Sequence, residues 1–311
     1  MQDFLVNWIA NIPGFAVPFA LAALGLIITE KSGVLNLGAE GFMLMGAMTG
    51  AGAVIVLGGY PLIALLLASL AAAALALVFA GLVIGLRVNQ VISGLLMVFL
   101  AQGLTSLIAT QQGWTNRAIT GLGKLELGPL ADIPVLGPIL FHQDLIVYLT
   151  VPIFLAVWLV LMRTHTGLRM RAVGENPDAA DAAGVNIELY RLGAVLVGAA
   201  LVGLAGGYLT VVVAKIWVDD MAGGRGWIAI ALVIFARWHP WRALAGALLF
   251  GGIEALIPRV AAAGIEVPQY FMLMLPYAVT LLVMVWTSLA KDRAADEPGA
   301  LGQPHVREER R

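Results

Sequence analysis

The sequence predicts an all-α, polytopic membrane protein with about nine transmembrane segments, and three observations support this fold class. Of the 311 residues, 60% are hydrophobic and only 12% are charged, whereas about 25% of the residues in soluble domains are charged. The mean hydropathy is +0.92. Long apolar runs recur from one end of the chain to the other, which indicates many membrane-spanning helices and not a single anchor on a soluble domain.

Four predicted spans come first. Each is a long apolar run, and the breaks between them contain charged residues, glycine or proline, which are typical of turns. A long stretch over 116–143, predicted to lie outside, is rich in Gly, Pro and Asp and follows the fourth span. The four spans cover Ile12–Thr29, Leu35–Leu57, Leu62–Leu86 and Val91–Thr110.

Five further apolar segments complete the predicted transmembrane domain over residues 1–289. The seventh is short for a bilayer crossing, which needs about 20 residues, so it is open whether 225–238 spans or re-enters. Residues 290–311 are polar and are predicted to form a disordered cytoplasmic tail. The five segments cover Leu145–Met162, Leu192–Ala214, Trp227–Ala236, Ala243–Pro258 and Tyr270–Leu289.

A polar loop over 163–191 separates the fifth and sixth spans. It contains four arginines and cannot lie in hydrocarbon. Within it, Asn176 can cap a helix and Pro177 suits the first helical position. Alanines follow, and Gly184 can end the helix. This predicts a short, smooth helix suited to docking in a groove of another protein; an ordinary connecting loop is the alternative.

The distribution of positive charge predicts the orientation. If the polar loop is cytoplasmic, nine spans place the N-terminus outside and the C-terminus inside. The inside then holds 13 of the 18 lysine and arginine residues and the outside holds 5, as the positive-inside rule requires.

Several classes of chemistry find little support in the sequence. The net charge of −1 argues against a nucleic-acid surface, and the absence of cysteine excludes thiolate catalysis and zinc–sulfur sites. The four histidines are scattered, which argues against a membrane-embedded enzyme. No phosphate-binding loop of the G-x-x-x-x-G-K-[ST] type is present. If ATP is used, another subunit must bind it.

Polar residues in or beside the spans are the candidates for a solute pathway, because such groups are expensive in a membrane and usually line a cavity. Two pairs are spaced four apart, as on one helix face, and glycines around the first pair suggest a loosened backbone. The open alternatives are a structural role for Glu40, satisfied by backbone amides or a nearby cation, a helix cap at Asn89 and an interfacial position for Trp227. The candidates are Asn36, Glu40, Asn89, Ser93, Gln102 and Trp227.

Glycine pairs spaced four apart predict close contacts between helices, because small residues let backbones approach in a membrane. The pairs are Gly46/Gly50, Gly81/Gly85 and Gly203/Gly207.

Three stretches then resemble a known family. Residues 28–47, I-T-E-K-S-G-V-L-N-L-G-A-E-G-F-M-L-M-G-A, resemble the N-terminal segment of bacterial ABC-importer permeases of the branched-chain amino acid, ribose and nucleoside superfamily. Residues 167–185, G-L-R-M-R-A-V-G-E-N-P-D-A-A-D-A-A-G-V, are similar to its cytoplasmic coupling loop, and residues 224–256 match its C-terminal signature. Within the superfamily the likeness is greatest to the shorter permease of nucleoside (simple-sugar-like) importers.

The resemblance implies an inner-membrane permease working by alternating access. It implies a second homologous permease, an ATP-binding subunit that uses the ATP, and a substrate-binding lipoprotein or periplasmic protein, with no cofactor bound by this chain. Contact with the ATP-binding subunit is carried over onto Gly174, Glu175, Asn176, Pro177, Ala180, Ala183 and Gly184.

The solute and the transporter class remain open at this stage. Few charges lie at depth in the spans, which suits a nucleoside or sugar better than a branched-chain amino acid. A branched-chain amino acid or ribose-type sugar permease of the same superfamily is the first alternative. A secondary transporter, which would need a coupling-ion site, is the second.

Overall fold

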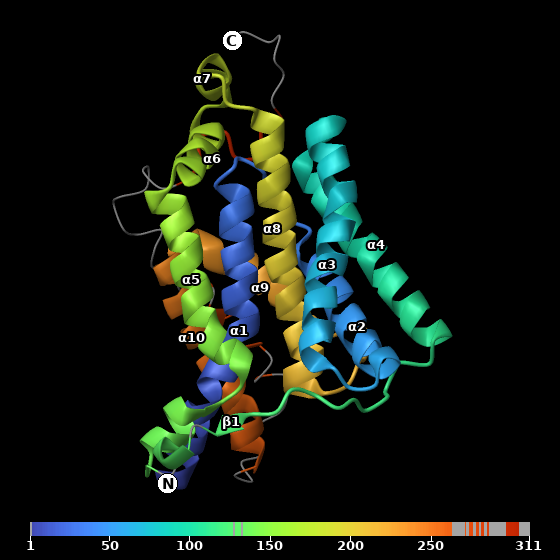
Figure 1. Ribbon diagram of the computed structural model, residues 1–311, viewed down its shortest axis with the longest axis vertical. Coiled ribbons are helices and arrows are strands. Elements are labelled where there is room, and N and C mark those ends of the chain that lie inside the picture. The colour runs from blue at the N-terminus through green and yellow to red at the C-terminus, as the bar shows by residue number, and fades with distance from the viewer. Residues whose placement is uncertain are drawn as a thin grey trace.

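Seven helices in the described part of the chain are long and apolar enough to cross a membrane (Figure 1). The computed structural model describes residues 2–126, 128–131, 133–262 and 297–304, together with separate positions between 271 and 285. The seven helices are α1 (Gln2–Glu30), α2 (Ala39–Leu57), α3 (Pro61–Ala80), α4 (Gln90–Gln111), α5 (Leu145–Arg163), α8 (Ile187–Tyr208) and α10 (Pro240–Ala262).

Shorter elements connect these helices. Two lie in the polar loop, α6 (His165–Glu175) and α7 (Pro177–Ala182), and α9 (Arg225–Ala236) is a short apolar helix. At the opposite end of the bundle, β1 (Leu125–Glu126) and β2 (His142–Gln143) form a small antiparallel pair (Figure 1). The remaining helical turns are η1 (Gly81–Gly85), η2 (Gly128–Leu130), η3 (Gly137–Phe141) and η4 (Leu209–Ala214).

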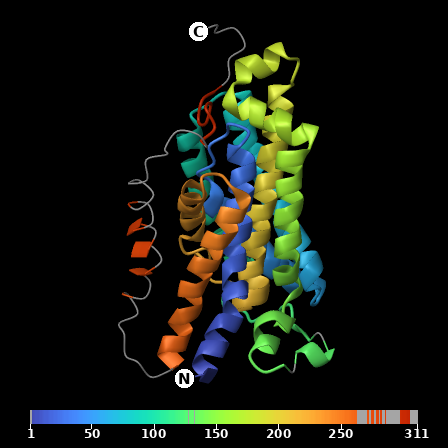
Figure 2. The same cartoon turned by 90° about the vertical axis from the view of Figure 1, so that its left-hand side faces the viewer.

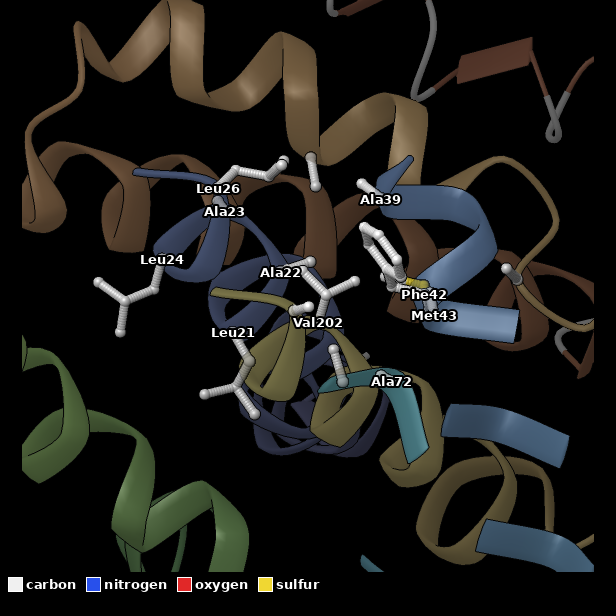
Figure 3. Close-up of a cluster of buried hydrophobic side chains, with 14 of the residues drawn as sticks. Leu21, Ala22, Ala23, Leu24, Leu26, Ala39, Phe42, Met43, Ala72 and Val202 are labelled. Carbon is white, nitrogen blue, oxygen red and sulfur yellow. The ribbon is translucent and has the colours of Figure 1, made fainter. Parts of the chain in front are cut away.

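Helix α1 lies at the centre of the bundle, beside α8 and α10 (Figure 2). It is apolar on all sides, and a helix of that kind is expected to be buried. Accordingly, 78% of its membrane-compatible window is buried, against 22% in α5. Figure 3 shows part of this core, with Leu21 and Leu24 from α1, Phe42 from α2 and Val202 from α8. The exposed faces of α4 and α5 are left for lipid or partner subunits.

Two of the three predicted glycine pairs meet each other across α2 and α8. A Cβ atom on Gly46 would overlap the backbone of Gly203, and one on Gly50 would lie 3.1 Å from the Cα of Gly207. Among the described residues, no atom lies within 4 Å of a Cβ built on Gly81 or Gly85, so the predicted close contact of the third pair is not confirmed.

The prediction of nine spans is confirmed only in part. The ninth segment, Tyr270–Leu289, lies largely outside the described residues. The seventh contains a helix of only 12 residues, but the chain around it connects the two ends of the bundle. Trp217 pairs with the segment after α4 at the β1–β2 end, and the Nε1 of Trp238 donates to Glu30 at the far end of α1 (2.6 Å). Segment 217–238 therefore traverses the bundle as an irregular stretch followed by a half-length helix.

Candidate functional site

The chain breaks its helical structure at two places that meet inside the bundle. Residues 31–38 after α1 form a turn and an extended stretch, with Gly33 at φ +84°. Residues 215–224 before α9 are likewise irregular, with Gly224 at φ +85°. Both α2 and α9 therefore begin within the bundle, and broken helices with paired ends are typical of binding sites in transporters.

The carboxylate of Glu40, in the first turn of α2, joins these two breaks. Its Oε1 accepts a hydrogen bond from the Gly224 amide and its Oε2 accepts one from the Gly226 amide, both at 2.7 Å. Glu40 is only 4% exposed. A negative charge is stabilised at a helix N-terminus by its free N–H groups and dipole. Glu40 thus caps the N-terminus of α9, although Gly224 and Glu40 are 184 residues apart in the sequence.

Glycine is required at position 226 by this arrangement. A Cβ atom there would lie 2.5 Å from the backbone N and Cα of Glu40, closer than real side chains approach. The next contact outward is an ion pair between Arg225 and Glu254 of α10, with Nη2 and Oε2 3.0 Å apart. The guanidinium also donates to the Ala222 carbonyl (3.2 Å). The positive charge of Arg225, beside the Glu40 cap, is therefore already paired with the carboxylate of Glu254.

A cavity of about 340 Å³ opens beside the Glu40 cap. It brings together three of the six predicted pathway residues, Glu40, Gln102 and Trp227. Asp220 and Phe99 complete its polar and aromatic lining, and the remaining lining is Leu44, Leu95, Val98 and Gly224. An aromatic wall with a few convergent polar groups is the usual composition of a small-molecule site.

The other three predicted residues lie elsewhere, and two expected pairings are wrong. Because α2 begins at Ala39, Asn36 is not on a helix face with Glu40; its Oδ1 accepts from the Gly38 amide (3.0 Å). Asn89 precedes α4 and caps it, accepting from the Ile92 amide (3.1 Å), so it does not share a helix face with Ser93. Ser93 and Asn36 are buried, and within the described part of the chain the Ser93 hydroxyl and Asn36 Nδ2 have no hydrogen-bond partner.

The short helix predicted in the polar loop is present as α7. Asn176 caps it, with its Oδ1 accepting from the Ala179 amide (3.0 Å), and Pro177 occupies the first position. Gly184 has φ +79°. The sequence did not predict α6, although Thr164 caps it through the Gly167 amide (3.1 Å). The loop is thus two consecutive helices at one end of the bundle (Figure 1).

The seven residues proposed to contact another subunit divide into an exposed and a buried set. Glu175, Asn176, Ala183 and Gly184 are exposed, and Pro177 is half-buried. Ala180 is only 4% exposed and packs against Val173 and Ile187. Gly174 is also buried, and a Cβ on it would overlap the Lys31 carbonyl. The structure therefore places Ala180 and Gly174 inside the protein, away from any docking surface.

The base of the polar loop contacts both the first helix break and the end of the chain. Residues 297–304 form a turn whose Ala300 amide donates to the Gly174 carbonyl (2.9 Å). The Gly302 amide donates to the Gly33 carbonyl (3.3 Å), and the Gly299 amide donates to Glu175 Oε2 (3.2 Å). The sequence predicted disorder for residues 290–311, but residues 297–304 form a turn that is hydrogen-bonded to the polar loop and the first helix break.

Several polar contacts were not predicted from the sequence, because their partners are distant in the chain. Glu30 is 2% exposed and bonds Trp238 across 208 residues. Asp220 belongs to the irregular stretch before α9, and Arg225 is the first residue of α9. A charged residue at the boundary of an apolar run, such as Glu30 or Arg225, was the available signal.

Comparison with known proteins identifies the family of this chain. Residues 8–284 match the model of the family described as "Branched-chain amino acid transport system / permease component". The chain belongs to this permease family. It is therefore a multi-pass membrane protein and an ABC transporter permease, which favours this class over the secondary transporter considered from the sequence.

Individual relatives of the permease cover nearly its whole length. TsgC13 of Haloferax volcanii, an ABC transporter permease provisionally named for glucose, is 37% identical over 94% of this chain and 95% of its own. The guanosine ABC transporter permease protein NupQ of Bacillus subtilis is 34% identical over 95% of each chain. The nucleoside ABC transporter permease protein NupC of Lactococcus lactis is 31% identical over 89% of this chain and 90% of its own. No solved structure matches the permease.

Proposed function

We propose that this chain is the permease subunit of an ABC importer that moves a nucleoside, or a related sugar-like solute, into the cytoplasm. The observation that carries the proposal is the cavity beside the two helix breaks, where Glu40, Gln102 and Trp227 meet. The names of two relatives, a guanosine permease and a nucleoside permease, support the same solute class.

The cavity suits a neutral, ring-shaped solute that forms hydrogen bonds. Trp227 and Phe99 offer aromatic surfaces on which a flat base can stack. The Gln102 amide can both donate and accept, which matches the edge of a nucleobase. The Glu40 carboxylate already accepts two backbone hydrogen bonds, so it demands no cation from the solute.

A branched-chain amino acid fits the cavity less well. Its ammonium group could meet Glu40 or Asp220, but none of the nine lining residues is basic. The nearby guanidinium of Arg225 is paired with Glu254. The carboxylate of an amino acid would therefore enter without a countercharge among the lining residues.

A sugar remains the second candidate, because sugar hydroxyls can also bond Gln102 and the sugar ring can pack on Trp227. The relative provisionally named for glucose is 37% identical to this chain. The experiment must therefore separate a nucleoside from a free sugar.

In this transporter, partner subunits supply the energy for transport. ATP is hydrolysed by a separate ATP-binding subunit that contacts the exposed residues of α7, and this chain is non-catalytic and binds no cofactor. A second homologous permease completes the pathway, and a substrate-binding lipoprotein or periplasmic protein delivers the solute. The assembly lies in the bacterial inner membrane, with α6 and α7 on the cytoplasmic side.

Packing at the base of the loop supports a route for coupling. Gly174 lies against Lys31 and Gly33, at the start of the irregular stretch 31–38. That stretch leads directly to Glu40 and the α9 cap. A displacement of α6 and α7 by the ATP-binding subunit would therefore shift the first helix break and, through it, the cavity wall.

Uptake of radiolabelled uridine or adenosine tests the solute assignment. Cells carrying the whole transporter, with and without this chain, are compared in the presence of excess unlabelled ribose or leucine. Loss of uptake on removal of the chain, with uptake unaffected by ribose and leucine in its presence, is the expected result. Uptake that ribose abolishes would move the solute to the sugar class, and unchanged nucleoside uptake without the chain would overturn the assignment.

A further inference from the structure

A second, larger hollow lies on the outside of the bundle between α5 and α8, at the end where α6 and α7 are found. Its volume is about 560 Å³. In Figure 1, α1 passes behind the gap between these two helices, and Ile28 of α1 contributes to the lining. The lining is apolar except for the hydroxyls of Thr166 and Tyr190. This hollow is separate from the cavity at Glu40.

The walls of this hollow belong to the membrane-spanning helices and are open to their surroundings. Val160 of α5 and Leu189 and Val197 of α8 are 43%, 63% and 53% exposed, and all three line the hollow. They lie in the spans Leu145–Arg163 and Ile187–Ala214. Because these helices are long and apolar enough to cross a membrane, lipid is the expected surrounding of the exposed surface within the spans.

The mouth of the hollow is basic. Arg169 of α6 places its Nη1 3.5 Å from the Tyr190 hydroxyl, and Tyr190 is part of the lining. Arg169 is exposed. None of the described residues that line the hollow is acidic.

We propose that this hollow, a groove between α5 and α8, is a binding site for an anionic phospholipid, whose acyl chain fills the apolar groove and whose phosphate is held by Arg169. Arginine is well suited to a phosphate because its planar guanidinium can donate two parallel hydrogen bonds. Thr166 and Met170 of α6 also line the groove. The bound lipid therefore braces α6 against α5 and α8, at the base of the two loop helices.

Native mass spectrometry of the purified transporter, loaded with phosphatidylglycerol or phosphatidylcholine, tests the proposal. The groove is filled by Gly193→Phe, because Gly193 lines it and no atom lies within 4 Å of its built Cβ. Gly103→Phe is the matched control, since Gly103 is an exposed α4 glycine with equally open space. The charge is removed by Arg169→Gln, with Arg87→Gln, which changes an exposed arginine elsewhere, as control.

The wild type should retain phosphatidylglycerol in preference to phosphatidylcholine. Arg169→Gln should lower that preference about fivefold, the factor expected for one basic residue near a lipid surface. Gly193→Phe should lose the retained lipid of both kinds, and the two controls should match the wild type. Ion mobility of the same ions identifies any variant that has not folded.

Three results would overturn the proposal. The first is equal retention of both lipids by the wild type. The second is equal retention of phosphatidylglycerol by Gly193→Phe and Gly103→Phe. The third is complete loss of the lipid whenever the ATP-binding subunit is present, which would assign the groove to a protein partner. None of these results depends on the identity of the transported solute.

Discussion

At the scale of single residues, Glu40 shows how one carboxylate can hold two broken helices together. Both of its oxygens accept from backbone amides that belong to the start of α9. Burial of a charge is tolerated when such hydrogen bonds replace those of water. Its role as a structural carboxylate and its place in the cavity wall are therefore compatible, because the cap fixes the wall.

Replacing the carboxylate of Glu40 by an amide should weaken the cap. In Glu40→Gln, the amide nitrogen would face a backbone N–H as a second donor. We expect a loss of roughly 1–3 kcal/mol of stability, the cost of a buried unsatisfied polar group, measured as a lower unfolding temperature by tryptophan fluorescence. Glu126→Gln changes an exposed glutamate and is the control. Equal unfolding temperatures in the two variants would contradict the structural role of the cap.

Two alanines, Ala180 within α7 and Ala183 at its C-terminal end, give a second prediction at this scale. Ala183 is exposed and Ala180 is buried against Val173. Ala183→Trp should leave the unfolding temperature unchanged and uncouple ATP hydrolysis from uptake, because a large side chain interferes with docking. Ala180→Trp should instead destabilise the loop by about 1–3 kcal/mol through overpacking. Normal coupling in folded Ala183→Trp would count against α7 as the contact with the ATP-binding subunit.

At the scale of elements, local signals predicted helices well and long-range contacts poorly. Asn176, Pro177 and Gly184 act on the backbone next to them, so the sequence was sufficient to predict α7. The start of α2 was misplaced because Leu35 and Leu37 continue the apolar run, although the chain there is a turn. The Glu40 cap joins residues 184 positions apart, and no local pattern encodes such a distance.

The contact between α2 and α8 depends on glycine, so replacing a glycine at the contact tests how closely the two helices must approach. Gly46→Ala should prevent the close approach of the two helices, since the added Cβ would overlap the Gly203 backbone. Gly81→Ala, at an open position, should be neutral or stabilise by about 1 kcal/mol, because alanine is the better helix former. Detergent-solubilised protein compared by size-exclusion chromatography and thermal unfolding distinguishes the two outcomes. Equal behaviour would mean that the helices can separate without loss of stability.

At the scale of the whole molecule, composition predicted the all-α polytopic class, because it depends only on the summed hydropathy of many segments. The arrangement of the bundle depends on which apolar faces meet, and composition does not encode that. Helix α1 is central and α5 is peripheral, yet both contain a long apolar window. Three of the six predicted pathway residues share one cavity. Of the other three, Asn36 and Asn89 accept hydrogen bonds from backbone amides near helix starts, and Ser93 is buried in α4.

The orientation of the whole molecule is the last prediction, and the natural absence of cysteine makes it directly measurable. Single cysteines can be introduced without competing thiols. Asp178→Cys lies in α7, and Lys124→Cys lies next to β1 at the opposite end of the bundle (Figure 1). The excess of basic residues on the side of the polar loop predicts that α7 is cytoplasmic.

A membrane-impermeant maleimide should therefore label Lys124→Cys in intact cells whose outer membrane has been permeabilised. It should label Asp178→Cys only after the inner membrane is also opened. The reverse pattern would place the polar loop outside, where ATP is not available to a partner subunit. Because a soluble ATP-binding subunit can reach α7 only from the cytoplasm, that single result would remove the coupling role proposed for Glu175, Ala183 and Gly184, while leaving the cavity at Glu40 unchanged.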